Sequence, residues 1–343
     1  MNPEHQPLVS VIVPVYNGAE YLAECIESIL AQTYQNWVCI IVNNCSTDDS
    51  SGIARRFAAK DARIRVHENR EFLRAVPNYN GGLRLISPAS GYCKIVFADD
   101  WIFPECLARM VDVGEQHPTI GIIGAYGLQG RQVMWAGLPY PSSLVPGREI
   151  CRKLFLEDLY VFGTGTSVMY RASLVRNRDP FYNESNLHAD SEVCVALLRT
   201  WDFGFVNQVL TFTRVRPGSL TSFTNEINTL IAGRLHDLVT YGRDYLTPQE
   251  FDSCLDQLLS SYYDFLAKSV RRRRGKKFWD YHKMKLVEAG AGFDRIRLAK
   301  AVLGKLTSAV LNPKDTLEKV LKGSEIPRNP EFVPGFEEKR GTR

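Results

Sequence analysis

The chain has 343 residues, of which 45% are hydrophobic and 23% charged, with a formal net charge of +4. This near-average composition excludes a wholly disordered chain, a collagen-like repeat and a coiled coil, and the length suggests one large domain or two ordinary ones. No apolar run reaches the roughly 18 residues of a membrane-spanning helix and segment 1–7 is polar, so neither a transmembrane helix nor a signal peptide is expected.

Apolar, β-branched segments alternate with segments of helical periodicity from residue 8 onward. Strands are predicted at 8–16, 37–42, 64–67 and 92–97, and helices at 19–32, 51–60, 78–86 and 105–116. Such alternation is typical of an α/β fold, in which right-handed crossovers build a twisted, mostly parallel sheet flanked by helices. Ligands bind such sheets beyond the carboxyl ends of the strands. At those ends the chain has three polar segments, 14–18 (PVYNG), 43–49 (NNCSTDD) and 98–101 (ADDW).

The middle of the chain continues this pattern less regularly. Strands are predicted at 120–125 and 203–212, and a helix at 193–200. Segment 127–147 is rich in Gly and Pro and is long enough to be a substrate-facing loop. The eight cysteines are scattered without a Cys-x-x-Cys pair, which favours free thiols in a reducing compartment over disulfides or a zinc site.

Helical signals prevail from about residue 225, where we place a domain boundary. We therefore predict an α/β domain at 1–225, a helical accessory region at 226–322 and a flexible tail at 323–343. A basic block at 271–285 contains eight Lys or Arg residues and one Asp, so the rest of the chain is slightly acidic.

Two adjacent carboxylates, Asp99 and Asp100, follow the predicted strand 92–97. Neighbouring carboxylates that face a cleft repel each other unless a cation lies between them, and Mg²⁺ and Mn²⁺ prefer such oxygen ligands. The alternative is that Asp100 caps the following helix, which has Pro104 near its first turn.

A second acidic group, His188-Ala189-Asp190-Ser191-Glu192, precedes the predicted helix 193–200. Asp190 is a candidate general base for a hydroxyl nucleophile. The alternative is a helix start, with Asp190 as N-cap and Glu192 in the first turn. The Asn and Ser side chains of 43–50 are candidates for contacts with a nucleotide base, or they form a turn in which Ser46 or Thr47 opens a helix. Neither glycine-rich phosphate-loop motif, GxGxxG or GxxxxGK(S/T), occurs in the sequence.

Taken together and in order, these motifs are far more specific. The segments are VSVIVPVYNGAEYLAECIESILAQTY, IIVNNCSTDDS, NYNGGL, FADDW, GTGTSVMYR, HADSE and LTFTRVRPGSLTS. They closely resemble the inverting family 2 glycosyltransferases of GT-A fold over about residues 8–225. The resemblance implies that 1–225 is a catalytic domain. It would move a sugar from a nucleotide-diphosphate sugar, with a UDP-sugar favoured, to a hydroxyl of a glycan, polysaccharide or lipid-linked precursor.

The resemblance also implies roles for individual residues. The nucleotide would contact Pro14, Tyr16, Asn17, Asn43, Asn44 and Asn80. Asp99 and Asp100 match the acidic motif that contacts the ribose and holds Mn²⁺ or Mg²⁺ on the diphosphate. Asp190 matches the catalytic base, and Arg214 and Arg216 belong to a loop, 214–219, that closes over the donor phosphates.

The chain departs from the family pattern at four places. Phe97 replaces the first carboxylate of the acidic motif, and Arg216 replaces a His that can join the metal shell; an Arg pairs with phosphate instead. Asn43 replaces an Asp, and Ala189 replaces a Glu beside the base. The changes at Phe97 and Arg216 leave metal dependence open, and they make a non-catalytic sugar-nucleotide-binding or scaffold protein the alternative. The change at Asn43 leaves the preferred nucleotide base open.

The accessory region lies outside the resemblance. Aromatic residues interleave with the cations of 271–285, and an apolar stripe with further cations follows at 296–310. This pattern suits an anionic membrane surface, contacted through 271–310. It predicts a cytoplasmic enzyme that is peripheral on the inner face of the membrane. The alternative is that these helices pack on the catalytic domain or a second subunit, and nucleic acid is the least favoured partner.

Overall fold

The computed structural model of the chain describes residues 6–215, 227 and 229–311. The chain divides into two compact units, Met1–Gly233 and Arg234–Arg343. The boundary predicted at residue 225 and the tail predicted at 323–343 fall outside the described residues.

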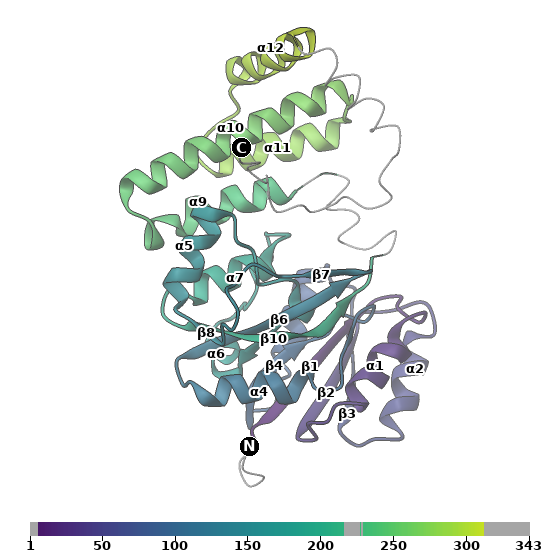
Figure 1. The fold of residues 1–343 in the computed structure, drawn as a ribbon. Helices are drawn as coiled ribbons and strands as arrows, with labels where there is room; N and C mark the ends of the chain where they lie inside the picture. The colour runs from purple at the N-terminus through teal and green to yellow at the C-terminus, as the bar shows by residue number, and fades with distance from the viewer. Residues whose placement is uncertain (1–5, 216–226, 228, 312–343) are drawn as a thin grey trace. The chain divides into compact units, whose positions relative to one another are not determined.

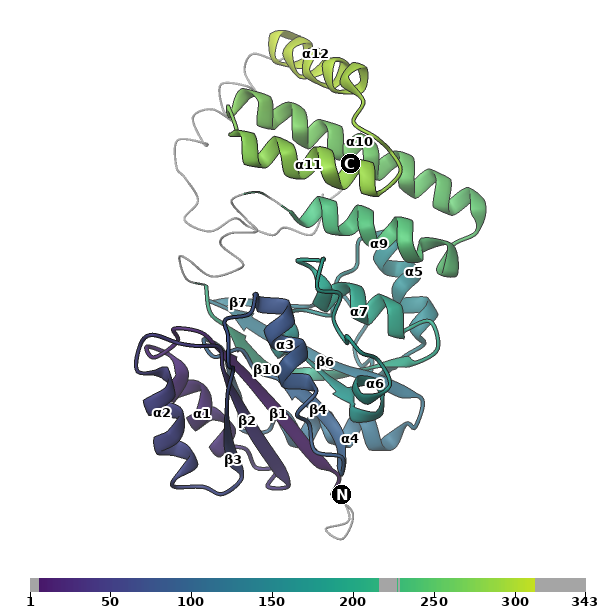
Figure 2. The same cartoon turned by 180° about the vertical axis from the view of Figure 1, so that it is seen from behind.

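The first unit is built on one ten-stranded sheet with helices on both faces (Figures 1 and 2). Its strands are β1 (Leu8–Val15), β2 (Trp37–Asn43), β3 (Ile64–Glu68), β4 (Ser90–Ile95), β5 (Trp101–Ile102), β6 (Ile120–Gln129), β7 (Gln132–Met134), β8 (Leu144–Val145), β9 (Val168–Arg171) and β10 (Asp202–Thr213). The order is β3-β2-β1-β4-β9-β6-β10-β5, with β7 on β6 and β8 on β10. Strands β3, β2, β1 and β4 run parallel, as do β6 and β10. The prediction of a mostly parallel α/β sheet is therefore confirmed.

The helices of this unit are α1 (Leu22–Leu30), α2 (Ser50–Ala58), α3 (Ala75–Leu83), α4 (Cys106–Gln116), α5 (Gly147–Glu157), α6 (Ala172–Arg176) and α7 (Ala189–Leu197). Alternation along β1 separates the two faces of the sheet. Its valines belong to the core cluster that contains the apolar faces of α1 and α4, whereas Ile12 faces α3. Gly82 of α3 lies so close to Ile12 that an added Cβ would come within 2.6 Å of its side chain. Helix α3 therefore packs directly on the sheet.

The structure departs from the predicted elements in the middle of the chain. Strand β6 continues to Gln129 and forms a hairpin with β7, so segment 127–147 contributes β7 and β8 rather than a loop alone. Strand β9 is antiparallel to both of its neighbours, β4 and β6. Helix α7 begins at Ala189, so the acidic residues predicted to precede the helix lie in its first turn. The eight cysteines form no disulfide, as expected.

The second unit is helical, as predicted, and comprises most of α9 (Leu230–Tyr245), α10 (Pro248–Arg271), α11 (Lys276–Glu288) and α12 (Arg295–Leu311). Helix α10 starts with a capping box between Thr247 and Glu250. Its buried Tyr262 hydroxyl forms a 2.7 Å hydrogen bond with His282 Nδ1 of α11. Within the part of the chain that is described, no helix has the length and hydropathy needed to cross a membrane.

Candidate active site

The loops that follow β1 and β2 are joined by hydrogen bonds. The backbone N–H of Asn17 donates to Ser46 Oγ (3.0 Å), and that of Gly18 donates to Ser50 Oγ (2.9 Å). In return, the N–H of Thr47 donates to Asn17 Oδ1 (2.8 Å). Helix α2 starts after Asp49, so neither Ser46 nor Thr47 opens it. The polar segment after β2 therefore holds the β1–α1 turn in place.

Two exposed aromatic side chains stand beside this turn. Tyr16 is 49% exposed and Phe72 is 56% exposed, and their rings meet edge to face with centroids 4.8 Å apart. Pro14, in contrast, is buried in β1 next to Val42 of β2. Of the predicted base-lining residues in this segment, Tyr16 is thus the one whose ring is open to a ligand.

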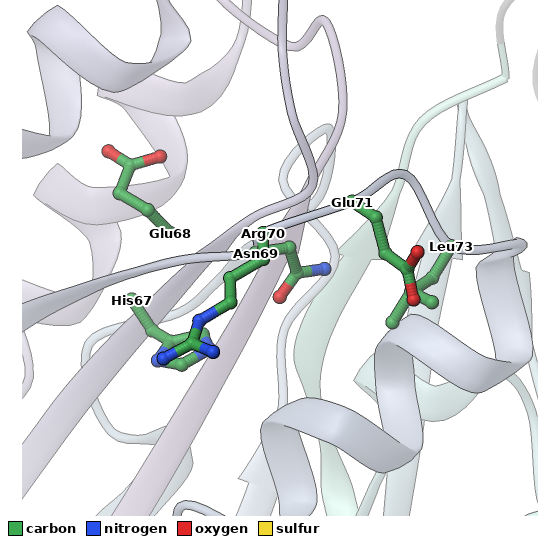
Figure 3. A pocket seen from close by; sticks show the side chains of 6 residues that line it. All are labelled: His67, Glu68, Asn69, Arg70, Glu71 and Leu73. Carbon is green, nitrogen blue, oxygen red and sulfur yellow. The ribbon is translucent and has the colours of Figure 1, made fainter.

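An open pocket of about 290 Å³ lies along the segment that follows β3 (Figure 3). Its walls are His67, Glu68, Asn69, Arg70, Glu71 and Leu73. Figure 3 shows the side chains of His67 and Arg70 on one side of the segment and that of Glu68 on the other. Because Phe72 belongs to the same segment, the pocket and the aromatic pair are adjacent.

Asn43 and Asn44 form hydrogen bonds with the segment that lines this pocket, and both are 3% exposed. Asn43 Nδ2 donates to Glu68 Oε2 (2.5 Å). Asn44 Oδ1 accepts from the backbone N–H of Leu73 (3.0 Å) and from Asn69 Nδ2 (2.9 Å). The two amides predicted to touch the base therefore hold the pocket segment.

The two asparagines of α3, Asn78 and Asn80, bond to different segments. Asn69 Nδ2 also donates to Asn78 Oδ1 (2.8 Å), so Asn78 reaches the pocket wall. Asn80, which was predicted to lie beside the nucleotide, is 1% exposed and exchanges two hydrogen bonds with the backbone of Tyr182 (2.8 and 2.9 Å). Its amide ties α3 to segment 182–184. Sequence reasoning missed Asn78, although the NYN repeat contained the signal.

The acidic motif is fixed by its neighbours. Asp100 is 3% exposed, and its two carboxylate oxygens accept from Thr166 Oγ1 (2.6 Å) and from the backbone N–H of Arg214 (2.9 Å). Burial raises the pKa of Asp100 to about 7, against the lowering effect of the Thr166 hydrogen bond. Glu105, not Asp100, precedes α4 as its N-cap residue. Asp99 is half-buried beside it.

Arg214 anchors the chain end that leaves β10. Its Nε donates to the backbone oxygen of Asp99 (3.0 Å), and its guanidinium pairs with Glu24 and lies 4.5 Å from the centroid of the Tyr21 ring. These contacts hold Arg214 against the acidic motif and α1. Arg216, the second predicted arginine, lies outside the described residues.

The carboxylates fit a divalent cation only with help from a ligand. No group of three or more His, Cys, Asp or Glu side chains within 6–215 and 229–311 could hold a metal ion. Asp99 is the more accessible carboxylate, whereas both oxygens of Asp100 accept protein hydrogen bonds. Phosphate oxygens would complete the oxygen-rich shell that Mg²⁺ and Mn²⁺ prefer.

A buried lysine supports the motif from within the sheet. Lys94 of β4 is 0% exposed, and its Nζ donates to the backbone oxygens of Thr166 (2.7 Å) and Val168 (3.3 Å). Burial lowers the pKa of Lys94. Thr166 belongs to the 3₁₀ helix η1 (Gly165–Ser167) and donates in turn to Asp100. Sequence reasoning missed Lys94, and its only signal was a charge inside the apolar run YCKIVF.

Asp190 lies in the first turn of α7, whose N-cap residue is His188. Its Oδ1 accepts from the backbone N–H of Ser191 (3.0 Å), and no donor of the described residues reaches Oδ2. Burial raises the pKa of Asp190 to about 6. Glu192 differs: it is 4% exposed and accepts from the amides of Asn183 and Asn186. Glu192 therefore holds the preceding loop, and Asp190 keeps an oxygen available.

Tyr79 of α3 connects the two acidic groups. Burial raises the pKa of its phenol, and the negative charges of Asp190, Asp99 and Asp100 raise it further. Its ring packs on Phe97, with centroids 5.0 Å apart. The Tyr79 phenol is therefore close enough to Asp190 and to the acidic motif to feel the charges of both. The sequence contained no signal for this tyrosine, since the contact joins α3, α7 and the end of β4.

The matching family model falls within the first unit. Residues 10–178 match the sequence model of Glycosyl transferase family 2. EpsE of Bacillus subtilis is 33% identical over 154 residues, which are 42% of this chain and 54% of that protein. Glycosyltransferase GlyG of Streptococcus pneumoniae is 38% identical over 120 residues, 35% of this chain and 39% of GlyG. The chain thus aligns with about half, or less, of the length of these relatives.

Solved structures show the shared fold. TarS 1–349 of S. aureus in complex with UDP-GlcNAc has a TM-score of 0.61 at 16% identity, covering 92% of both chains. The mannosyltransferase PcManGT of Pyrobaculum calidifontis, in complex with GDP-Man and Mn²⁺, has a TM-score of 0.56 at 17% identity and covers 92% of this chain and 84% of its own. Residues 10–178 therefore match glycosyl transferase family 2, and the chain has the GT-A fold of these solved structures.

Proposed function

We propose that the protein is an inverting glycosyltransferase that moves a sugar from a nucleotide-diphosphate sugar to an acceptor hydroxyl. The observation that carries this proposal is that Asp190, which keeps one carboxylate oxygen available, and the acidic motif both act on the same phenol, that of Tyr79. An acidic motif suits the donor diphosphate through a cation, and a carboxylate of raised pKa suits proton removal from a hydroxyl. The two groups are what a direct displacement requires.

The donor nucleotide is assigned to the carboxyl ends of β1, β2 and β3. Its base would stack on Tyr16 and Phe72 above the pocket segment, and its diphosphate would lie at Asp99. A UDP-sugar is the favoured donor, in line with the UDP-GlcNAc bound to TarS, whereas PcManGT is in complex with GDP-Man. The favoured acceptor is a glycan or a lipid-linked precursor of a polysaccharide.

The residues then act as follows. Asp190 takes the proton of the acceptor hydroxyl as its oxygen attacks the anomeric carbon from the face opposite the diphosphate, which inverts that carbon in one displacement. Thr166 and the Arg214 backbone keep Asp100 in place beside Asp99, the carboxylate assigned to the donor diphosphate. A divalent cation held by Asp99, with Asp100 behind it, would supply positive charge to the leaving diphosphate. Phe97 and Tyr79 present an apolar wall in which such charges interact more strongly than in water.

Donor identity can be tested by thermal unfolding of the full chain with UDP-, GDP- and dTDP-sugars, each with and without Mn²⁺. We expect the UDP-sugar with Mn²⁺ to raise the melting temperature most, because it is the favoured donor. A ligand at one hundred times its Kd stabilises the folded state by about 2.7 kcal/mol. Absence of a shift with every donor would contradict the proposal. A shift without donor hydrolysis or sugar transfer would instead support the alternative, a sugar-nucleotide-binding protein that lacks catalysis.

The base position can be tested by Phe72→Ala. Stacking on an aromatic side chain contributes about 1–3 kcal/mol per base, so we expect the Kd of the donor nucleotide to rise at least ~5-fold. Thermal stability without ligand should not change, because Phe72 is 56% exposed. Tyr140→Ala is the matched control, since Tyr140 is an aromatic residue that is 80% exposed elsewhere on the first unit. Equal donor affinities for the two variants would exclude Phe72 from the base site.

A further inference from the structure

Helices α11 and α12 each bury one face and expose another. On α11, Phe278, His282 and Leu286 are buried, with His282 bonded to Tyr262 of α10. Helix α12 is tied to α10 by ion pairs of its lysine and arginine side chains, Lys305 with Asp264 and Arg297 with Asp256. The opposite faces of both helices therefore have no partner among residues 234–311.

Apolar side chains protrude from these exposed faces. Met284 and Val287 of α11 are 48% and 63% exposed, and Ile296 and Leu303 of α12 are 69% and 60% exposed. Their spacings, three residues on α11 and seven on α12, place each pair on one side of its helix. Single exposed apolar residues are ordinary in proteins, but aligned pairs on two successive helices form stripes.

The same segments expose cations that have no acidic partner. Lys285 pairs with Glu288 (2.8 Å), in addition to the two pairs that join α12 to α10. Among residues 272–305, the cations without a carboxylate partner are Arg272, Arg273, Lys276, Lys277, Lys283, Arg295 and Lys300. Mutual repulsion of such a group is relieved by an anionic partner.

We infer that this basic-apolar surface, made of those seven cations with Met284, Val287, Ile296 and Leu303, binds an anionic lipid bilayer. Anionic headgroups match the unpaired cations, and the boundary between headgroups and acyl chains accepts the protruding apolar side chains. The long Lys and Arg side chains can keep their charges at the headgroups while their methylene stems lie along the apolar stripe. Nucleic acid would match the cations only and would leave the stripes in water.

The test is co-sedimentation of the full chain with vesicles of phosphatidylcholine, with and without phosphatidylglycerol. We expect binding only when phosphatidylglycerol is present. Removing three cations of α11 with Lys276→Gln, Lys277→Gln and Lys283→Gln should lower the partition coefficient at least ~30-fold, since each Lys near a surface contributes to binding. Ile296→Asn with Leu303→Asn on α12 should lower it about 10-fold without removing charge.

The matched control removes the same charge from the first unit. Arg56→Gln, Arg109→Gln and Lys153→Gln replace cations that are ion-paired with Asp49, Glu105 and Glu149. This variant should bind vesicles within about 3-fold of the parent chain, because its cations lie outside the proposed surface. Binding that ignores lipid charge, an equal loss in the control, or normal binding by the α12 variant would overturn the proposal. Donor-induced thermal shifts of the α11 variant should stay unchanged, which separates this proposal from that of glycosyl transfer.

Discussion

Replacing Asp190 with Asn is expected to lower turnover at least ~100-fold, because general-base help contributes about 10²–10⁴-fold. The donor Kd should stay nearly unchanged, since the side chain is assigned to the acceptor hydroxyl and not to the nucleotide. Steady-state rates with saturating donor and acceptor, together with a thermal-shift titration of the donor, measure the two quantities separately.

The pH dependence of kcat/KM identifies the base independently. A base acts only when deprotonated, and the pKa of Asp190 in the free protein is raised to about 6. The rate should therefore fall about tenfold per pH unit below that value, and Asp190→Asn should lack this acidic limb. Any titration of Asp100, whose pKa is raised to about 7, should remain in that variant. Glu192→Gln is the control and should keep the limb, because Glu192 is engaged by Asn183 and Asn186. Near-normal turnover of Asp190→Asn with loss of turnover in Glu192→Gln would assign the base to Glu192.

Asp99→Asn is expected to abolish the gain in donor affinity that Mn²⁺ provides. Neutralising diphosphate charge through a cation is worth several kcal/mol, so the donor Kd measured with Mn²⁺ should rise at least ~30-fold. The Kd measured without metal should not rise, because the amide keeps the size of the carboxylate and removes its repulsion of the diphosphate. Isothermal titration with the favoured UDP-sugar, with Mn²⁺ and with a chelator, gives both values.

Asp179→Asn provides the comparison for that experiment. Asp179 is an ion-paired carboxylate of the same unit, bonded to Arg84 at 2.6 Å and 65% exposed. Its loss should change neither Kd. If Asp99→Asn retained the full Mn²⁺ effect, the cation would have to be held elsewhere, and Asp100→Asn would be the next variant to measure.

The fold was largely predictable because hydrophobic runs and turn residues alternate regularly up to β4. The order of the later strands was not, since β9 enters antiparallel between β4 and β6 and its four residues carry no mark of direction. The helical second unit was also predicted, because 3.6-residue periodicity is a local property.

The sequence predicted which segments lie at the candidate site, but not which partners their side chains contact. Tyr16 is exposed and Asp99 and Asp190 are half-buried, whereas the amides of Asn43, Asn44 and Asn80 are turned to the protein itself. Motif spacing cannot distinguish these cases, because an amide that holds a loop and one that holds a base occupy the same place in the chain. Tyr79 and Lys94 act through contacts between distant segments, which a single sequence does not encode locally.

The hydrogen bonds that join the loops after β1 and β2 have a consequence for how quickly a ligand can be captured. The backbone N–H groups of Asn17 and Gly18 already donate hydrogen bonds to the side chains of Ser46 and Ser50 before any sugar nucleotide binds. The proposed nucleotide site is therefore preorganised at these two loops, and association there should lose little chain entropy. The association rate constants of different nucleotides should therefore be similar, and differences in their affinity should come mainly from their dissociation rate constants.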